Sequence, residues 1–357
     1  MKYRTGIGFC LLFVAAGALP AETIVRGPDG VFIGERIEQS VAMKAGQKLT
    51  VKASASLSGN LKVTVGGGVC RVVYQKRLKA ESRSVAAEYA GEITVEAAAN
   101  PEGVAVSLTA PNRAAWSGTN DAGRVEVEIT IPEGSDIVLA TAYFDINAIG
   151  PFREVMITES LSKVDVENVT AGTEIKVANR PLTVKHARGR LAVTNQYAGI
   201  KLVDVYTGDE TGLVSNDNGE VVIESYRGGI DVRTSNDRIF GQRLFLTGSK
   251  NRVKNTSGPI ALAFDSLTTG KFRIANQFGA VTITIAGRTN AAFICRPAEA
   301  SRVMADQMSM EPTLVYDNRL EFTTGGGEAE VRITTKEEGN IIITGSGKAV
   351  AGGASDE

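Results

Sequence analysis

Four stretches of the chain share one pattern: VTNQYAGIKL at residues 193–202, VSNDNGEVVI at 214–223, VKNTSGPIAL at 253–262 and IANQFGAVTI at 274–283. In each, an apolar residue stands two positions before an asparagine. A glycine follows the asparagine by three or four residues, and a second alternating run then begins. Alternation with period two is typical of a strand with one buried face, and the glycine indicates a tight turn. The pattern therefore predicts a unit of two short strands joined by a turn.

The same apolar–any–polar segment recurs beyond these stretches, at a spacing of roughly 16 to 21 residues. Two strands and two turns in such a repeat are typical of one coil of a β-solenoid, whose coils stack about 4.8 Å apart and share one core. An up-and-down barrel or a propeller is the alternative, but a barrel needs no repeated polar column and propeller blades usually run to about 40 residues or more. We therefore predict an all-β fold, a single-chain β-solenoid (a β-helix-like stack of two-strand coils of about 20 residues). The polar positions are Glu159, Asn179, Asn195, Asn216, Thr234, Asn255 and Asn276.

The rest of the chain divides around this repeat. Residues 132–345 carry the solenoid repeats, whereas residues 22–131 show strands without a clean period and predict an irregular β-rich N-terminal region or cap. One short helix is expected there, over residues 80–90, because alanine and glutamate favour helix and Gly91 can end it. Residues 346–357 are rich in glycine, alanine and serine and predict a disordered tail.

The N-terminus has the features of a secretory signal peptide, assigned to residues 1–21. Two basic residues precede an apolar run at residues 9–19, and small residues follow, with cleavage after Ala18 or after Ala21 as the alternatives. The run falls short of the roughly 18 apolar residues that a transmembrane helix needs. We expect an exported protein, periplasmic or extracellular, without membrane insertion.

The charge balance is close to neutral. The chain has 39 lysines and arginines and 40 aspartates and glutamates, and loss of residues 1–21 removes Lys2 and Arg4, leaving 37 against 40 and a net charge of −3. This balance predicts no nucleic-acid partner and no attraction to an anionic membrane. Two cysteines remain, Cys70 and Cys295. A disulfide and two buried free thiols are both open, and their wide separation along an elongated stack favours free thiols.

Residues 124–150 have the sequence RVEVEITIPEGSDIVLATAYFDINAIG. This stretch resembles the signature of a family of bacterial β-strand-repeat domains of unknown function that are regarded as candidate adhesins, in which a V-x-V-x-I-x-x-P-x-G strand leads into G-D-I-like coils. It departs from that pattern where Tyr143-Phe144-Asp145 replaces the usual glycine before aspartate. The resemblance covers roughly residues 40–345 and implies a β-solenoid with an adhesin-like role. It supplies no catalytic residues, because the family has no established activity.

The chemistry of the chain offers little for catalysis. His186 is the one histidine, with no second histidine to build a zinc cluster and little basis for a Ser-His-Asp triad. We therefore predict no enzyme activity, no catalytic residue, no cofactor and no metal site.

Two repeated features are candidates for binding. His186, Tyr206 and Tyr226 follow one another at 20-residue intervals, so a constant period predicts a short ladder of rings that can stack on sugars. The alternative is ordinary packing of aromatic residues at a corner. The second feature is a corner column of asparagines, structural if it closes each turn, or a row of sugar-binding amides if it faces a ligand. Its members are Asn179, Asn195, Asn216, Asn255 and Asn276.

These features favour an exported, non-enzymatic β-solenoid with a repetitive binding face, adhesin-like or envelope-associated, whose partner is a protein or a surface polysaccharide. One alternative is a polysaccharide lyase or hydrolase on a β-helix, which needs converging carboxylates and a basic residue. Another is a self-assembling structural envelope protein. The lyase or hydrolase requires two of Asp204, Asp217, Asp231 and Asp237 to meet Lys201 or Arg233 in one groove.

Overall fold

The computed structural model describes residues 23–286, 289–306, 314–316 and 318–345. The predicted signal peptide at residues 1–21 and the predicted tail at residues 346–357 lie outside these ranges. In the described part of the chain, no helix has both the length and the apolar character needed to span a bilayer.

The all-β prediction is confirmed: the described residues form 26 strands, joined in one sheet, and one helix. The N-terminal part contains β1 (Val25–Arg26), β2 (Phe32–Val41), β3 (Lys48–Ala53), β4 (Ser58–Val65), β5 (Cys70–Lys79), α1 (Arg83–Glu92), β6 (Thr94–Asn100), β7 (Gly103–Thr109), β8 (Ala122–Ile131) and β9 (Asp136–Ala140). The middle contains β10 (Phe144–Ser160), β11 (Val164–Ala178), β12 (Leu182–Arg188), β13 (Arg190–Gln196), β14 (Ile200–Asn218), β15 (Val221–Asn236), β16 (Ile239–Leu246), β17 (Lys250–Ser257), β18 (Ile260–Leu267), β19 (Lys271–Phe278) and β20 (Val281–Ile285). The C-terminal part contains β21 (Ala291–Arg296), β22 (Val303–Asp306), β23 (Leu314–Tyr316), β24 (Arg319–Thr324), β25 (Ala329–Glu338) and β26 (Ile341–Gly345).

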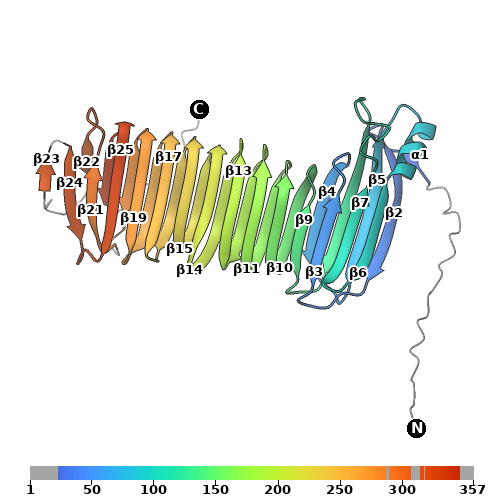
Figure 1. Ribbon diagram of the computed structural model, residues 1–357, viewed down its shortest axis with the longest axis horizontal. Helices are drawn as coiled ribbons and strands as arrows, with labels where there is room; N and C mark the ends of the chain where they lie inside the picture. The colour runs from blue at the N-terminus through green and yellow to red at the C-terminus, as the bar shows by residue number, and fades with distance from the viewer. Residues whose placement is uncertain (1–22, 287–288, 307–313, 317, 346–357) are drawn as a thin grey trace, which may run out of the picture.

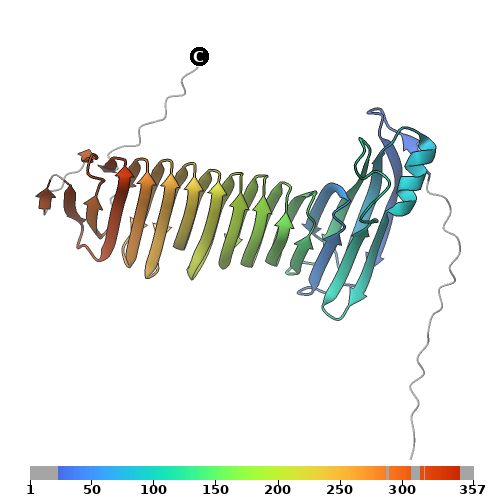
Figure 2. The same ribbon diagram turned by 45° about the horizontal axis from the view of Figure 1, so that its top comes forward.

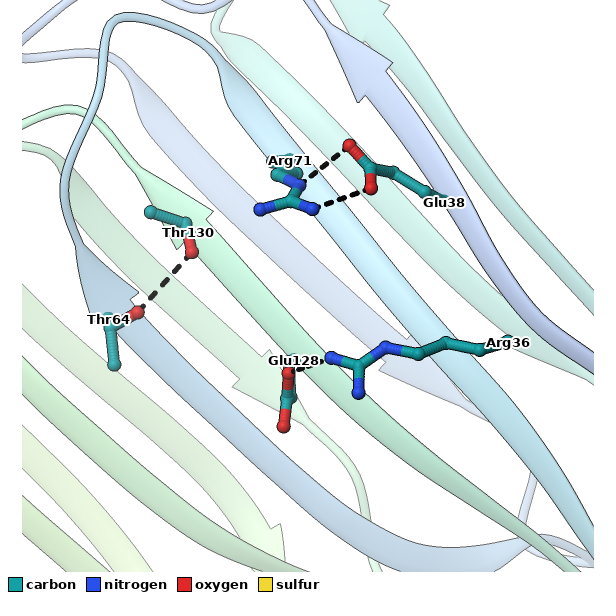
Figure 3. Close-up of polar contacts among 6 residues, drawn as sticks. All are labelled: Arg36, Glu38, Thr64, Arg71, Glu128 and Thr130. Atoms are coloured by element: carbon teal, nitrogen blue, oxygen red, sulfur yellow. Dashed lines mark hydrogen bonds and ion pairs between the residues drawn. The ribbon is translucent and has the colours of Figure 1, made fainter.

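The N-terminal part begins with antiparallel strands: β2 pairs with β5, and β5 with β8. The outer face of these strands carries paired charges (Figure 3). Arg71 donates two hydrogen bonds of 2.6 Å to Glu38, and Arg36 lies 2.7 Å from Glu128. The hydrogen bond from Arg71 holds the pKa of Glu38 below its usual value. Nearby, the hydroxyls of Thr64 on β4 and Thr130 on β8 lie 3.4 Å apart.

The predicted helix is present, but its end differs from the prediction. Ser82 is its N-cap, and the Ser82 hydroxyl accepts a hydrogen bond from the backbone N–H of Val85. Gly91 lies inside the last turn, and Ile93 is the C-cap, with an extended backbone. The helix therefore ends where the chain enters β6, and the assignment of Gly91 as the helix stop was wrong.

From β10 to β20 the strands form an elongated stack of parallel strands (Figure 1, Figure 2). Val164 on β11 pairs with Leu182 on β12, one repeat later along the chain, and we use coil below only for such a repeat, the stretch of chain between two paired positions. Ile200 pairs with Val221, which is a longer step along the sequence, so the offset between neighbouring coils varies.

Two ladders of paired strands result. The first ladder runs through the start of β10 and β11, then β12, the starts of β14 and β15, and β16, β18, β20 and β26. The second ladder runs through the ends of β10 and β11, then β13, the ends of β14 and β15, and β17, β19 and β25.

Long strands connect the two ladders. The start of β11 pairs with β12 and its end pairs with β13. β12 then pairs with the start of β14, and β13 pairs with the end of β14. These four strands thus form a closed ring of pairings. Apolar columns fill the space between the ladders, because alternate residues point to the same face. One such column, in register along the second ladder, is Val193, Val214, Val232, Val253 and Ile274, each at most 2% exposed.

The asparagine column lies at the end of the second ladder and is buried. Each asparagine Nδ2 donates one hydrogen bond to a carbonyl of its own turn and one to a carbonyl of the preceding coil. Asn216, for example, donates to Gly219 and to Ala198, both at 2.9 Å. Asn179 does not belong to the column, because Val177 is the residue in register with Asn195. The column consists of Asn195, Asn216, Thr234, Asn255, Asn276 and Thr335.

A second, unpredicted column bends five successive strands of the first ladder. At one position in five successive coils, non-glycine residues adopt a left-handed backbone, a conformation that costs about 1–2 kcal/mol for most residues. The bend directs the following residue inward and the next one outward. The residues are Asn168, His186, Asp204, Ser225 and Arg243, with φ of +61°, +52°, +53°, +60° and +53°. Their chemistry varies so much that no sequence pattern marks the position.

Replacing Arg243 with asparagine is expected to raise the free energy of unfolding by about 0.5 kcal/mol, because asparagine tolerates the left-handed conformation better than arginine does. Urea denaturation measures the change. Lys185→Asn is the matched control, since Lys185 is also exposed on the first ladder but lacks a positive φ. Equal effects at the two positions contradict the explanation.

Both cysteines are free and buried, Cys70 on β5 and Cys295 on β21. Burial raises the pKa of the Cys70 thiol to about 11 and that of Cys295 to about 12. The thiols are therefore protonated at neutral pH and act as small apolar side chains. The disulfide alternative is excluded in this structure.

Candidate binding site

A hollow of about 750 Å³ opens on the outer side of the first ladder, where the left-handed residues bend the coils. It crosses β11, β12, β14, β15 and β16, which are consecutive strands of that ladder. The left-handed residues Asn168, His186, Asp204 and Ser225 form one side of it. The site thus follows from the bend and not from a long loop.

The other side of the hollow is formed two residues further along each strand. Arg188 pairs with Tyr206, Tyr206 with Arg227, and Arg227 with Phe245. We call these four residues the cation–ring row. Neighbours in the row lie on adjacent strands, about 4.8 Å apart, so guanidinium groups and aromatic rings alternate along the stack.

The cation–ring row is accessible. Arg188 and Arg227 are exposed, Tyr206 is 46% exposed and Phe245 is half-buried. The Arg227 guanidinium carbon lies 5.2 Å from the centroid of the Phe245 ring, within the range of a cation–π contact. Within the described ranges neither arginine forms an ion pair, so both can bind an added anion.

One carboxylate faces the hollow among the described residues that line it, that of Asp204. Its Oδ2 lies 2.9 Å from Nδ1 of His186, on the preceding coil. Both side chains are about half exposed. The pair adds hydrogen-bonding groups to the site, and the carboxylate opposes an anion bound at the neighbouring arginines.

The three predicted ring residues all line the hollow but do not form one ladder. Tyr206 is in register with Arg227 and not with Tyr226, because the offset between these two coils is longer than the constant interval assumed. A slip of one residue turns a side chain to the opposite face. Tyr226 is accordingly fully buried, its hydroxyl donates to the Gly229 carbonyl at 2.7 Å, and burial raises its pKa. His186 lies in the left-handed column. The predicted ladder was wrong.

Arg188, Arg227 and Phe245 were not predicted from the sequence. The signal was their spacing relative to Tyr206, which is uneven and follows the offsets of the strand pairs themselves. A search at a constant interval cannot find such a row.

The carboxylates required for a lyase or hydrolase lie apart. Asp204 contacts His186, and Asp231 lies on the second ladder, 2.8 Å from Arg233. Asp217 and Asp237 lie near the asparagine turns, and Lys201 pairs with Glu224 at 3.1 Å. Of these residues, only Asp204 lines the hollow. In the described part of the chain, no group of three or more histidine, cysteine, aspartate or glutamate residues is placed to hold a metal ion.

No family model matches the chain, and no curated protein matches it in sequence. Among solved structures, the chain is similar to a candidate adhesin from Parabacteroides merdae, with a TM-score of 0.32, 6% identity and coverage of 87% of this chain and 96% of that one. The chain is also similar to a candidate cell adhesion protein from Clostridium sporogenes, with a TM-score of 0.22, 9% identity and coverage of 87% of this chain and 100% of that one. For a candidate adhesin from Bacteroides fragilis, the TM-score is 0.24 and the identity 12%, with coverage of 87% of this chain and 97% of that one. TM-scores this low establish no shared fold with these proteins.

Proposed function

We propose that the protein is an exported, non-enzymatic, adhesin-like β-solenoid, and that the hollow on the first ladder binds a surface polysaccharide that carries carboxylate groups. In this proposal the two ladders are two faces of the solenoid coil. The parallel, in-register pairing of successive coils, and the long strands that take part in both ladders, support it.

The observation that carries the proposed ligand is the alternation in the cation–ring row. Aromatic rings offer flat faces on which a sugar ring can stack, and guanidinium groups bind carboxylates through two parallel hydrogen bonds. Like groups in the row are two strands apart, about 9.6 Å. This distance is close to the length of a disaccharide in an extended pyranose chain, so a polymer with one acidic sugar per disaccharide matches the row.

The lack of enzymatic activity belongs to the same proposal. Acid–base cleavage of a glycosidic bond uses two carboxyl groups on either side of it, roughly 5 to 9.5 Å apart. Asp204 is the one carboxylate among the described lining residues of the hollow. Release of new chain ends from an acidic polysaccharide by the full chain contradicts a purely binding role.

Replacing Tyr206 with alanine is expected to weaken binding of a hyaluronan oligosaccharide, which carries one acidic sugar per disaccharide, about tenfold, because it removes the most exposed ring of the row. Arg227→Gln is expected to weaken it five- to tenfold, or about 1–1.4 kcal/mol, through loss of a charge-assisted hydrogen bond. Asp204→Asn is expected to strengthen it, because a repelling charge is removed. Isothermal titration calorimetry measures all three.

The control ligand is a neutral oligosaccharide of the same length, which we expect to bind more weakly and to be insensitive to the two charge variants. Arg296→Gln, exposed at the end of β21 and outside the hollow, is the control for loss of one positive charge elsewhere. Equal binding of acidic and neutral oligosaccharides, or unchanged binding by Arg227→Gln, contradicts the proposed ligand.

A further inference from the structure

The outer face of the second ladder carries a concentration of positive charge on β17 and β19. Lys250, Arg252 and Lys254 alternate with buried residues along β17, and Lys271 and Arg273 do so along β19, so all five are exposed on one side. We call these five residues the basic face. β17 and β19 are neighbours in the stack (Figure 1).

Like charges stand opposite one another on this face. Lys250 is in register with Lys271, and Arg252 with Arg273, across strands about 4.8 Å apart. In the described part of the chain none of the five forms an ion pair. Like charges placed directly opposite each other in a sheet destabilise it. The arrangement therefore costs folding stability that an anionic partner can recover.

The same chain pairs its exposed charges elsewhere. On the N-terminal strands, Arg71 is bound to Glu38 and Arg36 to Glu128 (Figure 3). The acidic groups flanking the basic face are also engaged. Asp231 on β15 lies 2.8 Å from Arg233, and Glu330 on β25 lies 2.7 Å from Arg332. Each of these ion pairs lies within one strand. Asp231 is also in register with Arg252, and Glu330 with Lys271, so the two carboxylates offset part of the charge, but the cations across the four strands remain in clear excess.

The shape of the charged area distinguishes between partners. Counting the flanking Arg233 and Arg332, it spans four strands, or about 14 Å, and runs from Lys250 to Lys254 along β17, or about 13 Å. It is about as wide as it is long, because the charged residues lie on neighbouring, parallel strands and not along a single strand. A single polymer chain requires a line of charges, whereas a lipid surface requires an area.

We propose that the basic face docks the protein on an anionic phospholipid bilayer, without insertion. Each lysine or arginine near such a surface strengthens binding about fivefold. At physiological ionic strength the Debye length is about 8 Å, so the attraction depends on this face and not on the net charge of the whole chain. The total charge of the chain is close to neutral and predicted no attraction to a membrane, because a total does not show that positive charges are concentrated on one face. The hollow lies on the other ladder, so a docked molecule leaves the polysaccharide site free.

Co-sedimentation of the full chain with vesicles tests this inference. We expect binding to vesicles of mixed phosphatidylcholine and phosphatidylglycerol but not to phosphatidylcholine alone, and loss of binding at about 1 M salt, where the Debye length is about 3 Å. Lys271→Gln is expected to reduce binding about fivefold and Arg273→Glu at least twentyfold. Arg273→Glu is also expected to raise Tm, because it places a carboxylate opposite Arg252. A merely unfolded variant cannot give a lower affinity together with a higher Tm.

Arg243→Glu is the matched control, since Arg243 is exposed on β16 of the first ladder and the charge change is the same. This variant is expected to retain vesicle binding. Tyr206→Ala and Arg227→Gln are likewise expected to leave vesicle binding unchanged, which separates this inference from the polysaccharide proposal. The inference is overturned if anionic vesicles do not bind, or if Arg243→Glu weakens binding as much as Arg273→Glu. It is also overturned if a soluble sulfated polysaccharide binds the basic face when vesicles do not.

Discussion

Replacing Gly189 with alanine is expected to destabilise the protein by more than about 3 kcal/mol. Gly189 joins β12 to β13 with φ of +80°, where an L-residue pays about 1–2 kcal/mol. An added Cβ also lies 1.9 Å from the carbonyl oxygen of Ala171 and 2.6 Å from its carbonyl carbon. Both are backbone atoms of the preceding coil, so relief of the clash requires the two coils to separate and weakens the stack on both ladders. Guanidinium denaturation measures the loss.

The control for Gly189→Ala is Gly208→Ala. Gly208 has a similar φ, +62°, but a Cβ there meets no atom of the described residues within 4 Å. We expect this variant to lose only the conformational part, about 1 kcal/mol. Equal losses at the two positions contradict the contact between coils as the cause.

Replacing Asn216 with alanine is expected to cost about 2 kcal/mol. The side chain is 1% exposed, and its Nδ2 donates to two carbonyls, those of Ala198 and Gly219. Removal leaves two buried acceptors without this donor, each worth about 1 kcal/mol or more. The buried Oδ1 of Asn216 has no hydrogen-bond partner among the described residues. Its removal is therefore favourable and offsets part of the lost free energy of unfolding. Urea denaturation followed by circular dichroism measures the difference.

The chain itself offers a graded control for Asn216→Ala, because threonine occupies the same column twice. The Thr234 hydroxyl donates to the Asn236 carbonyl at 2.9 Å, and the Thr335 hydroxyl to the Gly339 carbonyl at 2.7 Å. A hydroxyl thus keeps the bond within its own turn and loses the bond to the preceding coil. Asn216→Thr is expected to cost about half as much as Asn216→Ala. If the two variants lose the same stability, the asparagine does not link the coils.

The strands and the repeat could be predicted because they depend on local patterns. Val214 and Asn216 share a strand, and the glycine that follows them marks a turn whatever the neighbouring coil contains. The helix followed from composition in the same way. Its C-terminal boundary did not, because the start of β6 and not Gly91 determines where it ends.

The site could be predicted only in part, because which side chains face the hollow depends on the register between neighbouring strands. Tyr206 and Tyr226 are the same residue type at the predicted interval of 20 residues. The paired strands are offset by 21 residues, however, so Tyr226 is buried and Tyr206 is exposed. The column that contains His186 and Arg243 requires a backbone angle and not a residue type. The basic face was missed because Lys250 and Lys271 become neighbours only in the folded chain, and a total charge cannot show that.

The parallel stack has a mechanical consequence. A force that pulls its two ends apart acts across the strands, along the direction of their hydrogen bonds. The ladders then open one coil at a time, as a zipper does, and do not shear as a whole. One repeat, such as the 18 residues from Val164 to the position before Leu182, releases about 60–65 Å of extended chain. A tethered molecule of this kind yields in small steps under load and keeps the remaining coils, with their binding surfaces, folded.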